Sequence, residues 1–186
     1  GFAPGPKRPV VLAAGRVWDE AKNLRTLAAT APRIGWPVEI AGERRGPDGR
    51  EWDGEGGTAL GRLNAGALAG RMAVAAIFAH PARYEPFGLA PLEAALSGCA
   101  LVLGDIPSLR EVWEDAAVYV EPDDAGALAS AVNDLIADEG ARERLAERAL
   151  RRAARYTSER MGRAYAKVYR ELAARGVKGE PERALG

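Results

Sequence analysis

Short apolar runs alternate along the chain with segments in which apolar residues recur every three or four positions. The runs hold almost no charged side chains, as is typical of strands buried on both faces of a sheet. The alternation of strand and helix predicts an α/β fold, a doubly wound, Rossmann-like, six-stranded parallel sheet with helices on both faces. The six strands are expected over residues 9–14, 37–42, 58–63, 74–80, 99–105 and 116–122.

The helical segments fall between and after these strands. Ser108, followed by Glu111 three residues later, has the spacing of a capping box and predicts a helix start. The glycine-rich stretch 42–57 has no periodicity, so it is either a mobile loop or a lid over a ligand site. The helices are expected over residues 22–34, 65–72, 88–98, 108–114, 124–138, 140–154 and 158–174.

The chain of 186 residues is long enough for one domain and a trailing element. We expect a linker over 1–8, the α/β domain over 9–156, a separate final helix over 157–174 and a tail over 175–186. The first residue is glycine and not methionine, which suggests either a piece of a longer protein or a tagged protein.

Composition narrows the possible functions. The single Cys99 cannot form an internal disulfide, which fits a cytoplasmic protein, and one His with one Cys leaves no His/Cys metal site. The net charge of zero argues against nucleic-acid binding. Residues 141–170 nevertheless carry ten basic and three acidic side chains. These basic helices form either a solvated surface or a peripheral contact with an anionic membrane face or an acidic partner.

Two glutamates, Glu85 and Glu93, bracket seven uncharged residues. On a helix that begins near Gly88, Glu93 falls beside a stripe formed by Leu89, Leu92 and Leu96, where an unpaired carboxylate costs several kcal/mol. Either the two carboxylates serve a ligand, or an arginine neutralises Glu93 while Glu85 is solvated.

The predicted sheet places cations opposite this helix start. Arg16 follows the first strand and Lys22 lies six residues later, so both are expected in the crevice at the carboxyl ends of the strands. Free N–H groups at the helix start near Gly88 form an anion site. The segment after the first strand lacks the G-x-G-x-x-G of dinucleotide enzymes, which counts against NAD or FAD.

These motifs resemble a known family. The segment GRVWDEAKN (15–23) is similar to the G-R-x5-K segment of the retaining, glycogen-synthase-like GT-B glycosyltransferases of the family 4 type. EPFGLAPLE (85–93) resembles their E-x7-E motif, and residues 97–132 resemble the segment that follows it. The likeness extends over about residues 9–172. It implies the C-terminal, donor-binding half of such an enzyme, without the N-terminal half that binds the acceptor.

The resemblance implies a role for each matching residue. Arg16 and Lys22 would hold the diphosphate of a nucleotide-sugar donor, and Glu85 would bind the transferred sugar. Glu93 would bind the ribose hydroxyls. No metal cofactor is expected, because the two cations take its place. The backbone of Phe87, Gly88 and Leu89 would cradle the phosphates and the sugar, and the base would lie near Arg62 and Leu63.

The reaction implied is transfer of a hexosyl group from an NDP-sugar to an acceptor hydroxyl, with this piece inactive alone. Two other classes remain: a non-catalytic nucleotide-binding α/β module, and a nucleotide-sugar epimerase or phosphorylase of the same architecture. The charged set of Arg16, Lys22, Glu85 and Glu93 disfavours the first. A site that no longer binds its ligand is expected to lose charged side chains that are costly to hold together. A phosphorylase would need a cofactor lysine, which no segment suggests.

Several residues keep two interpretations. His80 either touches the donor sugar or is structural, and Trp18 either lines the crevice or covers the first helix. Cys99 is expected in the core.

The final helix carries an apolar stripe. In the GT-B enzymes that this chain resembles, this helix crosses to the N-terminal half. We therefore expect the stripe to be exposed or to pack against a second copy; it consists of Met161, Tyr165, Val168, Tyr169 and Leu172.

Overall fold

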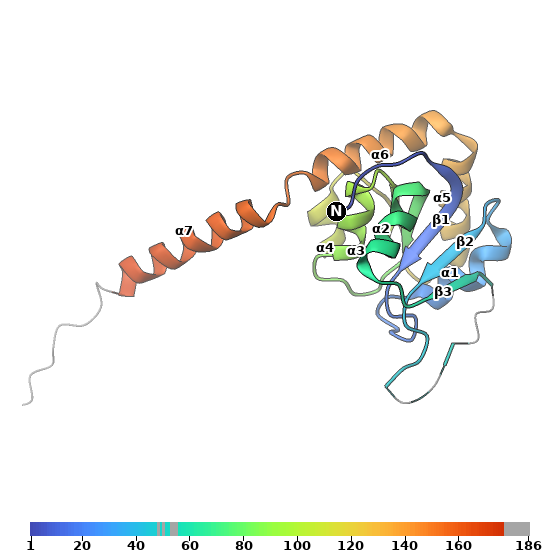
Figure 1. Cartoon of the computed structure of the whole chain (residues 1–186), viewed down its shortest axis with the longest axis horizontal. Helices are drawn as coiled ribbons and strands as arrows, with labels where there is room; N and C mark the ends of the chain where they lie inside the picture. The colour runs from blue at the N-terminus through green and yellow to red at the C-terminus, as the bar shows by residue number, and fades with distance from the viewer. Residues whose placement is uncertain (48, 50, 53–55, 177–186) are drawn as a thin grey trace, which may run out of the picture. The chain divides into compact units, whose positions relative to one another are not determined.

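A computed structural model describes residues 1–47, 49, 51–52 and 56–176 of the chain (Figure 1). Six strands form one sheet in the order β3-β2-β1-β4-β5-β6, and every neighbouring pair is parallel. The predicted doubly wound sheet is confirmed. The strands are β1 (Arg8–Ala14), β2 (Val38–Ala41), β3 (Thr58–Gly61), β4 (Ala75–His80), β5 (Ala100–Gly104) and β6 (Val118–Val120).

The central strands are apolar throughout because helices cover both faces of the sheet. Helices α1 (Leu24–Thr30) and α5 (Ala125–Ala137) pack together over one face, and α2 (Ala65–Val74) and α3 (Leu89–Leu96) pack together over the other. All six residues of β4 are buried. Alternate side chains point to opposite faces of a strand, so a core cluster on the α1–α5 face takes Val11, Ala13, Ile77 and Ala79.

The remaining helices follow the sheet. They are α4 (Pro107–Trp113), α6 (Glu139–Ala153) and α7 (Ser158–Gly176), and a short 3₁₀ turn, η1 (Ala31–Arg33), extends α1. Helix α6 packs against β5, α3 and α5. In the part of the chain that the structure describes, no helix is both long and apolar enough to cross a membrane.

The start of α4 differs from the prediction. The capping box over Ser108 and Glu111 is wrong, because the helix begins one residue earlier, with Pro107 at its first position and Ile106 as N-cap. Proline suits that position because its ring presets the helical φ and it lacks the N–H that would be unpaired there. The hydroxyl of Ser108 instead donates to the backbone oxygen of Glu85 at 2.6 Å.

The start of the predicted domain is held by side-chain contacts. Within the segment 1–8, Arg8 belongs to β1, and Lys7 Nζ donates to the oxygens of Ser97 at 2.6 Å and Ala75 at 2.9 Å. Cys99 is buried before β5, as predicted. Burial raises the pKa of its thiol to about 11.

The stretch 42–57 is described only in part, since residues 48, 50 and 53–55 lie outside the described residues. Arg45 and Glu51 form an antiparallel bridge, and Arg44 donates two hydrogen bonds to the backbone oxygen of Trp52, at 2.8 and 3.0 Å. Trp52 is buried. A ligand-covering role for this stretch stays a prediction.

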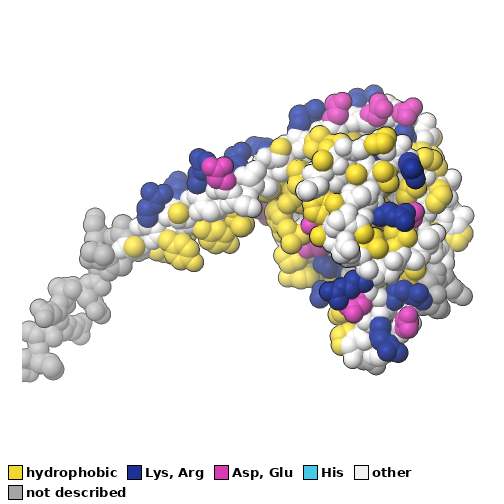
Figure 2. Space-filling view, viewed as in Figure 1, with side chains coloured by type: hydrophobic (Ala, Val, Ile, Leu, Met, Phe, Trp, Pro, Cys, Tyr) yellow, Lys and Arg dark blue, Asp and Glu magenta, His cyan; other side chains and the backbone are white. Residues whose placement is uncertain are grey.

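The chain divides into two compact units, Gly1–Ala153 and Ala154–Gly186. Helix α7 forms most of the described part of the second unit. One side of it carries hydrophobic side chains, and Lys and Arg side chains lie elsewhere on its surface (Figure 2). The five residues of the predicted stripe are each between 51% and 66% exposed: Met161, Tyr165, Val168, Tyr169 and Leu172.

Candidate functional site

The site is built where β1 and β4 lie side by side. These strands are neighbours in the sheet, and the chain leaves their carboxyl ends through residues 15–23 and 81–88. The order of strands reverses here, and ligands of doubly wound sheets bind at such a reversal. The predicted Arg16, Lys22 and Glu85 all lie on these two exits.

Glu85 is held by donors from three directions. Lys22 Nζ lies 2.7 Å from its Oε2, and His80 Nε2 lies 3.3 Å from the same oxygen. The backbone N–H of Gly88 donates to Oε1 at 3.1 Å. The Glu85 side chain keeps only 13% of its accessible surface. The interpretation of Glu85 as a solvated surface carboxylate is therefore wrong.

These contacts fix the charge of Glu85. The hydrogen bond from His80 lowers the pKa of the Glu85 carboxyl most, and burial opposes it. Lys22, at the shorter distance, also lowers it, and the pKa falls from 4.5 to about 2. Glu85 is thus an ionised acceptor at neutral pH.

The exits of β1, β4 and β6 are tied together by Asn23, which is buried and left-handed with φ 55°. Asparagine tolerates this conformation better than most residues. Its Nδ2 donates to the backbone oxygens of Pro81 at 2.9 Å and Pro122 at 2.6 Å, and its Oδ1 accepts from Thr26 Oγ1 at 2.6 Å. These hydrogen bonds therefore fix the backbone of Lys22, the residue before Asn23. No local pattern in the sequence predicts them.

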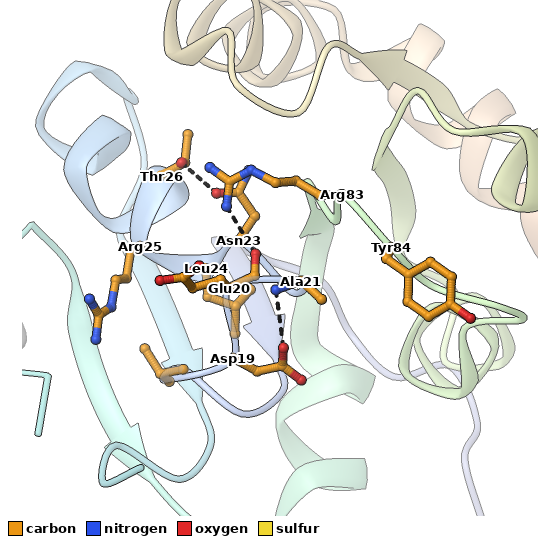
Figure 3. Close-up of a pocket in the computed structure, with 10 residues that line it drawn as sticks. Asp19, Glu20, Ala21, Asn23, Leu24, Arg25, Thr26, Arg83 and Tyr84 are labelled. Carbon is orange, nitrogen blue, oxygen red and sulfur yellow. Dashed lines mark hydrogen bonds between the residues drawn. The ribbon is translucent and has the colours of Figure 1, made fainter. Parts of the chain in front are cut away.

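Arg83 adds a second tie between the same loops. Its N–H donates to the oxygen of Ala21 at 2.9 Å, its guanidinium donates to the oxygen of Glu20 at 2.9 Å, and its Nε donates to Asp123 at 2.7 Å. Figure 3 shows the side chain of Arg83 reaching over this loop, while Tyr84 points away from it. The loops line an open cleft of about 530 Å³, which includes none of the predicted donor-binding residues.

Helix α3 begins beside Glu85, at a left-handed Gly88 with φ 89°. A Cβ at this position would lie 3.1 Å from Pro91, and the φ angle itself is unfavourable for other residues. The predicted orientation of α3 is wrong. Leu89 is 67% exposed, and the buried face is formed by Pro91, Ala94 and Ala95. Helix α3 packs against α6, the sheet and α2, and it does so without its leucines on the buried face.

Glu93 lies on the opposite side of α3 from this buried face, yet it is half-buried. Burial raises the pKa of its carboxyl. Over the described residues its side chain makes no hydrogen bond or ion pair, so the interpretation in which an arginine neutralises Glu93 finds no support. Of the two glutamates, Glu85 is thus paired, whereas Glu93 has no partner among the described residues.

A second cleft, of about 360 Å³, opens at the ends of β1, β2 and β3. Three of the predicted binding residues line it together: Arg16, Arg62 and Leu63. The backbones of Gly15 and Gly42 meet at its edge, and a Cβ on Gly42 would fall 1.6 Å from the oxygen of Gly15. Only glycine permits this approach. Arg16 and Lys22 were expected in one crevice, but Arg16 lines this cleft while Lys22 contacts Glu85.

Arg16 is already partnered. Its guanidinium lies 2.6 Å from Asp19 and 5.2 Å from the ring centre of Trp18, a cation–π contact. The Arg16 side chain remains 56% exposed, so it can turn toward a ligand. Phe87, the third residue of the predicted backbone cradle with Gly88 and Leu89, is half-buried just before α3. Within the described residues no three His, Cys, Asp or Glu side chains form a group that could hold a metal ion.

Comparison with known proteins relates this geometry to a family. Residues 8–138 match the family model described as Glycosyl transferases group 1. The phosphatidyl-myo-inositol mannosyltransferase of Mycolicibacterium smegmatis is 29% identical over 179 residues, which cover 90% of this chain and 46% of that protein. The glycogen synthase of Mycobacterium tuberculosis is 36% identical over 105 residues, 55% of this chain and 25% of that protein.

The same fold occurs in solved structures. Sucrose-phosphate synthase from Thermosynechococcus elongatus matches with a TM-score of 0.79 at 25% identity, over 93% of this chain and 50% of that one. The chain therefore spans half or less of the length of each of these relatives. The family match begins at β1 and ends just after α5, so it takes in the whole sheet and both strand exits that form the site. The chain belongs to the glycosyl transferases group 1 family.

Proposed function

We propose that the chain is the donor-binding half of a retaining GT-B glycosyltransferase of the glycogen-synthase-like group. Its substrate would be a nucleotide sugar, and the complete enzyme would transfer a hexosyl group to an acceptor hydroxyl. The observation that carries the proposal is the placement of Lys22, Glu85 and the start of α3 within hydrogen-bonding distance at the β1–β4 reversal.

The donor would extend across both parts of the site. The base would enter the cleft lined by Arg62 and Leu63, and the diphosphate would lie between Arg16, Lys22 and the backbone at the start of α3. Arg16 and Lys22 would each leave a carboxylate partner for the phosphates, which carry more charge than one carboxylate.

The two glutamates would bind hydroxyl groups. Glu85, ionised and held in place, would accept hydrogen bonds from the transferred sugar. Glu93, which lacks an ion-pair partner among the described residues, would gain two neutral donors from the ribose hydroxyls. A desolvated carboxylate is costly when empty and is well matched to such donors.

Catalysis would be mainly electrostatic. The acceptor oxygen would form a bond to the anomeric carbon on the same face from which the leaving group departs. The bond from that carbon to the phosphate oxygen would break. The electron pair stays on the diphosphate, whose charge Arg16 and Lys22 stabilise, and the acceptor proton passes to the departing phosphate. The two cations would take the place of a metal ion.

Titration calorimetry of the chain with UDP, GDP and ADP, each with and without EDTA, tests this proposal. We expect one of the three to bind more tightly than the others, with an affinity that EDTA leaves unchanged. Lys22→Met should weaken that binding about tenfold or more, while Lys167→Met, a change of the same type on α7, should not. Binding that disappears on chelation would refute the metal-free mechanism, and no binding by any diphosphate would refute the donor site.

A further inference from the structure

The Oε2 atom of Glu85 receives two donors that differ in mobility. Lys22 reaches it from the loop before α1, through a long side chain that is 18% exposed. His80 reaches it from the last position of β4 and is 1% exposed. Its ring stacks near Phe78, with ring centres 6.3 Å apart. Lys22 can therefore move, whereas His80 is fixed by the strand and by its burial.

The two ring nitrogens of His80 differ in their contacts. Its Nδ1 is buried and has no partner among the residues that the structure describes. The ionised Glu85 carboxylate can only accept hydrogen bonds, so the Nε2 atom carries a proton and donates it to Glu85. His80 is thus a donor fixed on the buried side of the carboxylate.

We propose that His80 is a positioning residue that holds the carboxylate of Glu85 when Lys22 moves to the diphosphate of the donor, an inference that rests on the proposed function. Without Lys22, Glu85 keeps two fixed donors: His80 on Oε2 and the N–H of Gly88 on Oε1. A carboxylate has about four acceptor positions, so two remain for sugar hydroxyls. His80 therefore lets Lys22 change partners while the sugar-binding carboxylate keeps its orientation.

The test compares the affinity of the 186-residue chain for nucleotide sugars with its affinity for the parent diphosphates. The probes are UDP-glucose, GDP-mannose and ADP-glucose, with UDP, GDP and ADP as their partners. His80→Leu removes the donor, whereas His80→Gln keeps an N–H at a similar reach from the backbone. Ile77→Ala is the matched control, because it weakens the same strand from the opposite face.

We expect His80→Leu to weaken nucleotide-sugar binding about tenfold and diphosphate binding less than twofold. His80→Gln should recover most of the loss, and Ile77→Ala should lower stability without changing either affinity. Equal losses for sugar and diphosphate, or the same selective loss in Ile77→Ala, would overturn the role of His80. A wild-type chain that binds none of the six probes would instead overturn the proposed function, and the inference with it.

The ring nitrogens give a second readout, independent of affinity. His80 is the single histidine of the chain, so its nitrogen NMR signals need no assignment. We expect Nε2 to stay protonated when the donor is added, and its signal to shift in Glu85→Gln. An Nε2 atom without a proton, or an Nε2 signal that does not respond to Glu85→Gln, would overturn the proposal.

Discussion

Replacement of Glu85 by glutamine measures how strongly the ligand-free site holds its charge. The change keeps the size of the side chain and removes the ionised acceptor of Lys22, His80 and the Gly88 N–H. The pKa of Glu85 is lowered from 4.5 to about 2. One pKa unit corresponds to about 1.4 kcal/mol, which gives about 3 kcal/mol for the full difference. Solvent screening at this half-buried site reduces the expected effect to about 1–2 kcal/mol.

The pH dependence of this contribution has a definite sign. A carboxyl whose pKa is lower in the folded state contributes fully above its unfolded pKa, here 4.5, because only the folded state keeps it ionised below that pH. The contribution is lost as the pH falls from about 4.5 to about 2. Glu85→Gln should therefore be less stable than the wild type at pH 7, and the difference should shrink below pH 4.5.

Urea unfolding followed by tryptophan fluorescence measures this difference. All four tryptophans, Trp18, Trp36, Trp52 and Trp113, lie in the first compact unit, so the signal reports the domain that holds the site. Other carboxyls titrate in the same range, but they do so in both proteins and cancel in the difference. A deficit that persists unchanged at pH 3 would contradict this expectation, because it would show an effect of packing and not of charge.

Two further predictions concern the other carboxylate and the last helix. Glu93→Gln should stabilise the ligand-free chain by about 0.5–1 kcal/mol, since burial raises the pKa of Glu93, and should weaken nucleotide binding in calorimetry. A loss of stability would instead indicate a structural ion pair. For α7, whose five stripe residues are exposed, we expect fast amide exchange beyond about residue 156 or a concentration-dependent dimer in sedimentation. A protected helix in a strict monomer would contradict this.

The sheet could be predicted because its signal is local and repeated. A strand buried on both faces must be apolar at every position, and the run from Ala75 to His80 satisfies this without exception. The parallel order follows from the helical connections, which leave few alternatives. This topology also predicts that Arg16, Lys22 and Glu85 lie near the carboxyl ends of β1 and β4.

The details of side-chain contact could not be predicted in the same way. The predicted orientation of α3 is wrong because the leucine stripe of the sequence does not mark the buried face. The face that packs against α6, the sheet and α2 carries Pro91, Ala94 and Ala95. The spacing of Ser108 and Glu111 predicts a capping box that the structure does not contain. The contact of Ser108 with Glu85 depends on a turn 23 residues away, and no local pattern carries that information.

The opposite environments of Glu85 and Glu93 suit them to different roles. Both carboxylates lose water, but only Glu85 gains donors in return, so its pKa falls while the pKa of Glu93 rises. A site that needed only negative charge would have paired both or exposed both. Glu85 keeps its charge and its orientation before any ligand arrives, which suits a group that must align a sugar for reaction. Glu93 is stabilised only when a ligand supplies donors, which suits a group that contributes to donor affinity and takes no part in bond breaking.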